Sequence, residues 1–212
     1  MRVLAPLEAH RLWAPVYDAS PNPLLALETR VMSKVLPDVA GLRVIDVASG
    51  TGRWARRLRA AGARVISVDL CPEMLRQAPQ PAVIADAGRL PLPDGCADLV
   101  LCAFAFAYLP PDLDEMVRIA RPGGQVLISD LHPAAGAHGW KRSFRAGGEE
   151  IVAGSRSGSF DELRHPRLRL VKLLEATIGE SERTYFEQAG KDELFERVRH
   201  VPAVYVARLV RL

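Results

Sequence analysis

The chain has 212 residues, of which 49% are hydrophobic and 25% charged, and its net charge is +3. That length supports one domain with a substantial core, and that balance is typical of a globular protein in water. Arginine supplies 24 of the 28 basic side chains, but these are scattered among acids. A nucleic-acid-binding protein gathers its basic residues on one face, so the composition argues against that class.

The cysteines and the N-terminus bear on the compartment. Cys71, Cys96 and Cys102 are odd in number and lack the paired spacing of a zinc site, which favours a reducing cytoplasm over a disulfide framework. Residues 1–13 carry charges and lack the apolar core of a signal peptide. No uncharged run reaches the roughly 20 residues that span a bilayer. We therefore expect a cytoplasmic protein with no membrane partner and no metal site.

Helix and strand patterns alternate from residue 22 to about residue 131. Strands are expected at 42–48, 63–70, 81–87, 96–106 and 123–131, and helices at 23–36, 51–62, 71–78 and 112–121. The strands are short apolar runs, as expected where both faces of a sheet are covered. Such alternation predicts right-handed β-α-β crossovers and a parallel, doubly wound α/β sheet.

The alternation ends after residue 131. Residues 134–160 are rich in glycine and serine, and Gly147-Gly148 lies between two short apolar stretches, which predicts a hairpin. A long strand at 167–179, a helical pair at 181–199 and a closing strand at 201–212 complete the chain. The glycine-rich composition of 134–160 predicts a mobile lid that opens at low free-energy cost.

A glycine-rich turn follows the first strand. Residues 50–55, GTGRWA, fit the loose dinucleotide-binding pattern G-x-G-x-x-G/A between a strand and a helix. Asp69 lies 17 residues after Gly52, at the end of the second strand, where an acid would hold a ribose diol. Taken alone, the pattern leaves open a nicotinamide-dependent oxidoreductase, and also a tight turn that binds no ligand.

Two further acids narrow the choice of ligand. Asp46 lies four residues before Gly50 at the end of the first strand, and Asp86 ends the third strand. A carboxylate at that edge repels a pyrophosphate and favours a cationic amino-acid group. Together with Asp69, these acids suit a ligand with an ammonium group, a ribose and an adenine amine. S-adenosylmethionine carries all three.

The chain resembles the class I S-adenosylmethionine-dependent methyltransferases, especially the bacterial enzymes that act on small molecules. The resemblance covers about residues 40–133 and rests on four stretches in the family's order, VIDVASGTGRW, VISVDLCPEML, ADAGRLPLPDGCADLVLCAFAFAYLP and RIARPGGQVLISDLHP. YDASPNPLLALE and PAVYVARLVRL resemble the family's first segment and its final antiparallel strand.

The resemblance implies roles for named residues. It assigns the methionine part of the cofactor, the ribose, the adenine and the sulfonium to residues at the strand ends. These are Asp46, Ala48, Gly50 and Gly52 for methionine, Asp69 for the ribose, Leu70, Asp86 and Ala87 for adenine, and Phe104 for the methionine and sulfonium. Two positions depart from the family. Ala48 stands where glycine is usual, and Ala107 and Tyr108 stand where histidines are common.

Three side chains are candidates for the acceptor chemistry. Methyl transfer is an in-line displacement, so the protein aligns the acceptor and, for some acceptors, removes a proton. His132 follows the fifth strand and would serve as a base or bind the acceptor, although capping of local backbone explains it equally well. Tyr17 would face the sulfonium by cation–π attraction, or pack with Trp13 on one helix face. Tyr108 is expected to face the acceptor.

The remaining histidines have weaker patterns. His138 and Trp140 lie in the lid and are within reach of an acceptor in principle, whereas His10, His165 and His200 show no partner pattern and are expected at the surface.

The sequence therefore predicts one domain over residues 1–212, with a helical segment at 1–40 and a lid at 134–160. Its fold is a seven-stranded, mostly parallel α/β sheet with an antiparallel last strand. Its function is methyl transfer from S-adenosylmethionine to a small organic acceptor, with S-adenosylhomocysteine as product. The alternatives are a nicotinamide-dependent oxidoreductase and a non-catalytic module that binds S-adenosylmethionine.

Overall fold

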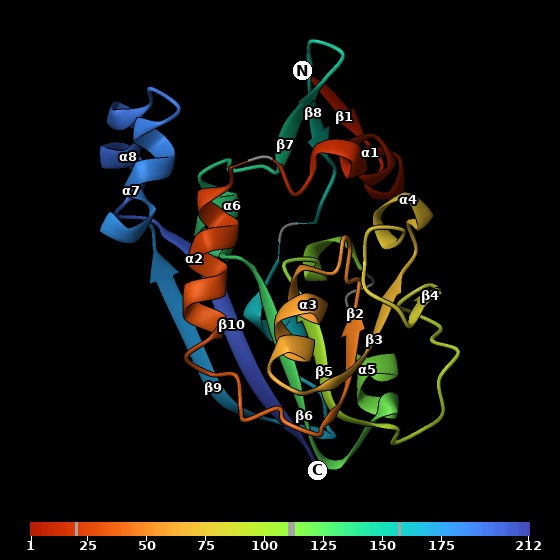
Figure 1. The fold of residues 1–212 in the computed structure, drawn as a ribbon. Coiled ribbons are helices and arrows are strands. Elements are labelled where there is room, and N and C mark those ends of the chain that lie inside the picture. Colours follow the sequence, from red (N-terminus) through yellow and green to blue (C-terminus); the bar gives the residue numbers. More distant parts are fainter. Residues whose placement is uncertain (20, 110–112, 157) are drawn as a thin grey trace.

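The computed structural model describes residues 1–19, 21–109, 113–156 and 158–212. Its centre is a seven-stranded sheet in the order β4-β3-β2-β5-β6-β10-β9 (Figure 1). The strands are β2 (Arg43–Val47), β3 (Arg64–Asp69), β4 (Ala82–Ile84), β5 (Ala97–Ala103), β6 (Ala120–Leu131), β9 (Leu168–Thr177) and β10 (Pro202–Arg211). Only β10 runs antiparallel to its neighbours β6 and β9, so the predicted antiparallel last strand is confirmed.

Helices cover both faces of this sheet, which explains the continuous apolar runs of its central strands. On one face, α2 (Pro23–Met32), α3 (Arg53–Ala60), α7 (Glu180–Glu187) and α8 (Asp192–Val198) contribute to one apolar cluster. On the other face, α5 (Asp114–Ile119) and the short 3-10 helices η2 (Phe106–Tyr108) and η3 (Phe160–Leu163) contribute to a second cluster. The carboxyl ends of the parallel strands are therefore the open edge of the sheet.

A second, three-stranded sheet lies beyond that edge (Figure 1). It contains β1 (Arg2–Leu4), β7 (Ser143–Ala146) and β8 (Glu149–Ala153), in the order β1-β8-β7. The predicted hairpin is confirmed as β7 and β8, but the sequence did not predict that β1 pairs with β8. The helix α1 (Pro6–Trp13) packs below this sheet, where Trp13 stacks on Phe144 with ring centroids 4.6 Å apart. We call residues 2–17 together with 143–153 the cap.

Some predicted boundaries shift. The strand expected over 96–106 ends at Ala103, because Phe104 adopts a left-handed backbone with φ of 60° and leaves the sheet. The helix expected over 112–121 is α5 at Asp114–Ile119, and its expected first residue, Asp112, lies outside the described residues. The fifth strand begins at Ala120, before the expected Gly123, with a break in its pairing to β5.

Among the described residues, none of the helices is long and apolar enough to cross a membrane. Within the same residues, no group of three or more histidine, cysteine or acidic side chains is arranged to hold a metal ion.

Candidate active site

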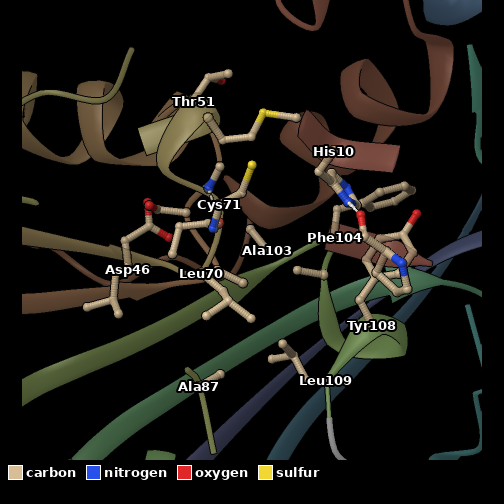
Figure 2. Close-up of a pocket in the computed structure, with 18 of the residues that line it drawn as sticks. His10, Asp46, Thr51, Leu70, Cys71, Ala87, Ala103, Phe104, Tyr108 and Leu109 are labelled. Atoms are coloured by element: carbon tan, nitrogen blue, oxygen red, sulfur yellow. Dashed lines mark hydrogen bonds between the residues drawn. The ribbon is translucent and has the colours of Figure 1, made fainter. Parts of the chain in front are cut away.

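A cavity of about 260 Å³ lies between the carboxyl edge of the sheet and the cap. Figure 2 shows Asp46, Leu70 and Ala87 on one side of it and His10, Phe104 and Tyr108 on the other. The predicted site residues that line it are Tyr17, Asp46, Ala48, Gly50, Asp69, Leu70, Asp86, Ala87, Phe104 and Tyr108. The structure thus brings most of the predicted site together, because parallel strands end at one edge of the sheet.

Asp69 is oriented by the backbone around it. Its two carboxylate oxygens accept hydrogen bonds from the backbone N–H of Gly50, at 2.7 Å, and of Cys71, at 2.8 Å. Burial raises the pKa of Asp69, and these N–H donors oppose that shift by favouring the anion. The carboxylate is therefore fixed between the glycine turn and the end of β3, with lone pairs left to accept hydroxyl groups.

Asp46 is buried at the end of β2, with 1% of its surface exposed. Its Oδ2 has no hydrogen-bond partner among the described residues. The pKa of Asp46 is raised to about 7. Burial is the largest cause, Asp69 and Glu28 act in the same direction, and Arg53 opposes them. An unpartnered carboxylate oxygen on the wall of a cavity is costly unless a ligand supplies a donor or a cation.

Leu70, Asp86 and Ala87 lie together at one end of the cavity, where a flat ring could pack on Leu70 and donate to Asp86. Leu70 leaves 47% of its surface exposed, although it is a large apolar side chain beside the cavity. Asp86 accepts a hydrogen bond from the Gly88 N–H at 2.8 Å through one oxygen, Oδ1. Its carboxylate therefore keeps acceptor capacity for an amine at this end of the cavity.

Gly52 does not line the cavity. Its φ is 80°, and a Cβ there would lie 2.6 Å from Pro79 Cδ and 2.9 Å from Ala78 Cβ. Those distances are closer than packed carbon atoms reach, so only glycine fits. The structure explains this glycine by the packing of α3 against residues 78–79.

Ala48 takes the conformation that usually calls for glycine. Its φ is 53°, in the left-handed region, directly after β2. An alanine there costs roughly 1–2 kcal/mol, because its Cβ crowds the following carbonyl oxygen. Ala48, which stands where the family usually has glycine, is thus a strained residue in the wall of the cavity.

We expect Ala48→Gly to raise the free energy of unfolding by about 0.5–1 kcal/mol, since the relief of strain exceeds the entropy that glycine adds to the unfolded chain. Urea unfolding measures this difference. The matched control is Ala61→Gly, where φ is −87° and no strain is relieved. That variant should lose up to about 1 kcal/mol. An equal loss in both variants would mean that the Ala48 methyl packs more favourably than its backbone is strained.

A buried polar network supports the cavity from behind. Glu28 on α2 is fully buried and accepts hydrogen bonds from Arg53 at 2.7 Å, Trp54 Nε1 at 3.1 Å and Ser129 Oγ at 2.7 Å. The Ser129 carbonyl in turn accepts the Phe104 N–H at 2.8 Å. Three elements of the core therefore hold Phe104 in its left-handed turn, where its ring lines the cavity.

His132 does not reach the cavity. Its Nδ1 accepts the Ala134 N–H at 3.0 Å, so the ring proton sits on Nε2, which is 2.7 Å from Glu175 Oε2 on β9. Both ring nitrogens are therefore engaged, and neither is free to remove a proton. His132 is the N-cap of α6 (Pro133–Ala137), so its geometry agrees with the predicted alternative in which it caps local backbone.

The lid residues are also absent from the wall of the cavity. No described residue of 134–160 lines it. His138 is exposed and Trp140 packs on the cluster that contains α2 and α3. The hairpin buries Phe144 and Ile151 against the N-terminal helix, so this part of residues 134–160 is packed within the cap.

The N-terminal segment supplies side chains of the site that the sequence did not predict. His10 was expected at the surface, but it lines the cavity from α1. Asp18 accepts hydrogen bonds from Thr51 Oγ1 at 2.7 Å and Arg56 at 2.8 Å, and so ties this segment to the glycine turn. The helical spacing of His10 and Trp13 was a signal that they share a face, but not of which surface that face covers.

Arg142, directly before the hairpin of the cap, contacts residues on the far side of the cavity. Its guanidinium forms an ion pair with the buried Asp130 and a hydrogen bond with the Phe104 carbonyl. It also lies 4.2 Å from the Phe104 ring centroid and 4.7 Å from that of Tyr108, at cation–π distance. Asp130 is held in place by the Ala107 N–H at 2.6 Å.

The fold and this site define a class of protein: a doubly wound α/β domain with three acids and a glycine turn around a cavity at the carboxyl edge of its sheet. Residues 45–128 match the family described as methyltransferase domain, Methyltransf_11. This region is thus similar to a methyltransferase domain, and it contains β3 to β5, most of β2 and β6, the glycine turn and the three acids.

Relatives of known name are similar over the same region. The malonyl-[acyl-carrier protein] O-methyltransferase of Serratia marcescens is 37% identical over 105 residues, which are 46% of this chain and 40% of that protein. The demethylmenaquinone methyltransferase of Renibacterium salmoninarum is 34% identical over 136 residues, 58% of this chain and 57% of that protein. The chain thus spans roughly half the length of these relatives.

The fold is also that of solved methyltransferases. The S-adenosylmethionine-dependent methyltransferase of Mesorhizobium loti superposes with a TM-score of 0.66 at 21% identity, over 90% of this chain and all of that one. The likeness extends well beyond residues 45–128, so the whole sheet follows the methyltransferase architecture.

Proposed function

We propose that this protein transfers a methyl group from S-adenosylmethionine to a small organic acceptor. The observation that carries the proposal is the group of three strand-end acids on one cavity, with Asp46 Oδ2 left without a partner. The ammonium of the ligand's methionine part would satisfy Asp46, the ribose hydroxyls would donate to Asp69, and the adenine amine would donate to Asp86. The residues present therefore fit this ligand.

The ligand would supply an activated methyl group on a sulfonium, so the protein's own task is placement. Asp46, Asp69 and Asp86 would hold the nucleoside and amino-acid parts, while Phe104 and Tyr17 would border the sulfonium. Burial raises the pKa of Tyr17, which keeps its phenol neutral. The apolar walls would exclude water from the transfer.

Both the relatives and the lining of the cavity indicate the kind of acceptor. The named relatives carry out an O-methylation of malonyl-[acyl-carrier protein] and a methylation of demethylmenaquinone. The far side of the cavity in this chain is lined by Phe104, Tyr108 and Leu109, which suits an apolar or aromatic compound. We propose a small-molecule acceptor there, and no nucleic-acid or membrane partner.

We also propose that the lid is the whole cap, not residues 134–160 alone. Residues of α1 line the cavity directly, and the hairpin β7–β8 is joined to them through β1 and through the stacking of Trp13 on Phe144. Access to the cavity would then require residues 2–17 and the hairpin to move together, and the domain would remain one unit over 1–212.

Calorimetry with S-adenosylhomocysteine and with NAD tests the proposed function. We expect S-adenosylhomocysteine to bind with a micromolar dissociation constant, about −8 kcal/mol, and NAD to show no heat of binding. The reverse result would favour the oxidoreductase, against which Asp46 already argues. Binding without turnover of any acceptor would favour the non-catalytic module instead.

A further inference from the structure

His10 lies on the side of the cavity where the acceptor would bind (Figure 2). Its ring meets the Tyr108 ring edge to face, with centroids 4.9 Å apart. Tyr108 Oη is buried and has no hydrogen-bond partner among the described residues. Two polar groups from different elements, α1 and η2, therefore meet where the cavity is otherwise apolar.

The backbone of α1 decides which ring nitrogen of His10 carries the proton. Nδ1 is 2.7 Å from the Pro6 carbonyl oxygen, one turn earlier in the chain. A carbonyl oxygen only accepts, so Nδ1 must donate. The neutral ring therefore presents an unprotonated Nε2, for which no described residue provides a hydrogen-bond partner. His10 differs in this from His132, whose ring nitrogens are both engaged.

The surroundings keep the His10 imidazole neutral. Burial lowers its pKa, and the positive charge of Arg142 lowers it further. The Pro6 carbonyl and the Asp69 carboxylate oppose that shift without reversing it. The other ring neighbours are the aromatic rings of Tyr108 and Trp13. A neutral imidazole with a free nitrogen is the form that removes protons.

We propose that His10 is the general base of the acceptor reaction, and that the acceptor is a neutral phenol or enol rather than a carboxylate. This inference rests on the proposed methyl transfer. A neutral hydroxyl group is a weak nucleophile and benefits from a base, whereas a carboxylate is already ionised at neutral pH. The acceptor hydroxyl would donate to His10 Nε2 and accept from Tyr108 Oη.

The charges around the cavity support the same choice of acceptor. Arg53 is the one cation among the described residues that line it, and Glu28 accepts from it at 2.7 Å. Arg142 lies behind Phe104 and is already paired with Asp130. With both cations neutralised and three acids on the wall, the protein offers no cation to pair with an anionic acceptor, and burial of its charge is costly.

In the proposed step, the acceptor O–H bond breaks and its proton moves to His10 Nε2, while the oxygen forms a bond to the methyl carbon. The methyl carbon–sulfur bond breaks, and its electron pair stays on sulfur as a neutral thioether. The His10 imidazolium then releases the proton to water and regains its neutral form.

A matched pair of probes and a matched pair of variants test the proposal. The probes are 1-naphthol and 1-naphthoate, which share a ring system and differ in the acceptor group. Mass spectrometry measures how much S-adenosylhomocysteine forms with each probe. The variants are His10→Gln and His138→Gln. His138 makes the same kind of bond, Nδ1 to the Ala134 carbonyl four residues earlier at 2.8 Å, but lies outside the cavity.

We expect wild type and His138→Gln to methylate 1-naphthol and not 1-naphthoate. His10→Gln should lose about 100-fold in kcat, the effect of a missing general base, while its dissociation constant for S-adenosylhomocysteine stays within about twofold. At saturating S-adenosylmethionine, the wild-type kcat should fall as the pH drops through the His10 pKa, which lies below its ordinary value of about 6.5. This acid limb of kcat should vanish in His10→Gln.

Nitrogen NMR of the His10 ring gives a readout that needs no acceptor: an Nδ1–H tautomer that titrates below about pH 6.5. Any of four results would overturn the inference. They are an Nε2–H tautomer of His10, unchanged turnover in His10→Gln, a loss of S-adenosylhomocysteine affinity in His10→Gln as large as its loss of kcat, and methylation of 1-naphthoate but not of 1-naphthol. Failure with both probes would overturn the acceptor assignment. Loss of S-adenosylhomocysteine binding in the wild type would instead overturn the proposed function itself.

Discussion

Replacing Asp69 with alanine is expected to weaken S-adenosylhomocysteine binding about 10- to 100-fold. A carboxylate that accepts two ribose hydroxyls makes charge-assisted hydrogen bonds, and their loss costs roughly 1.5–3 kcal/mol. The carboxylate also fixes the Gly50 and Cys71 N–H groups, which would lose their acceptor. Calorimetry of the variant measures the affinity, and thermal unfolding checks that the fold persists.

Two further variants separate these contributions. Asp69→Asn keeps an oxygen for one of the backbone donors but loses the charge, so it should fall between wild type and Asp69→Ala. Asp161→Ala removes an aspartate whose side chain is 78% exposed and should bind as the wild type does. If Asp69→Ala retained wild-type affinity, the ribose would have to lie elsewhere and the proposed orientation of the ligand would be wrong.

The affinity for S-adenosylhomocysteine is expected to fall about tenfold between pH 8 and pH 6. In the ligand-free protein, burial raises the pKa of Asp46 to about 7, so at pH 6 most of this carboxyl group is protonated. Pairing with the ligand's ammonium requires the anion, so binding at pH 6 must release a proton. Above the pKa the group is already ionised, and the affinity should level off.

Calorimetry in two buffers with different ionisation enthalpies counts that proton. We expect close to one proton released at pH 6 and almost none at pH 8. Asp46→Asn should bind more weakly and lose the pH dependence, whereas His10→Gln should keep it, since these residues lie on opposite sides of the cavity (Figure 2). A pH dependence that survives in Asp46→Asn would assign the proton to another group.

The sequence by itself determined the sheet and the side of the cavity that carries the three acids. Buried parallel strands read as apolar runs such as 42–48, and their ends are marked by Asp46, Asp69 and Asp86. These signals are local, because each acid needs only to end its own strand for the sheet to bring all three together. The glycine turn and the hairpin at 143–152 are local in the same sense, since backbone conformation over a few residues decides them.

The tertiary structure alone decided what covers the cavity. The pairing of Arg2–Leu4 with β8 joins segments about 150 residues apart, and no local pattern marks such a partner. The same packing turns the face of α1 that carries His10 into the cavity. His132 also follows a strand that ends at the open edge of the sheet. The packing of β9 nevertheless places its ring against Glu175, away from the cavity. A side chain's position in the chain fixes its element, but the packing of elements distant in sequence determines which surface it faces. The side of the cavity that His10 and Tyr108 line is built from such contacts.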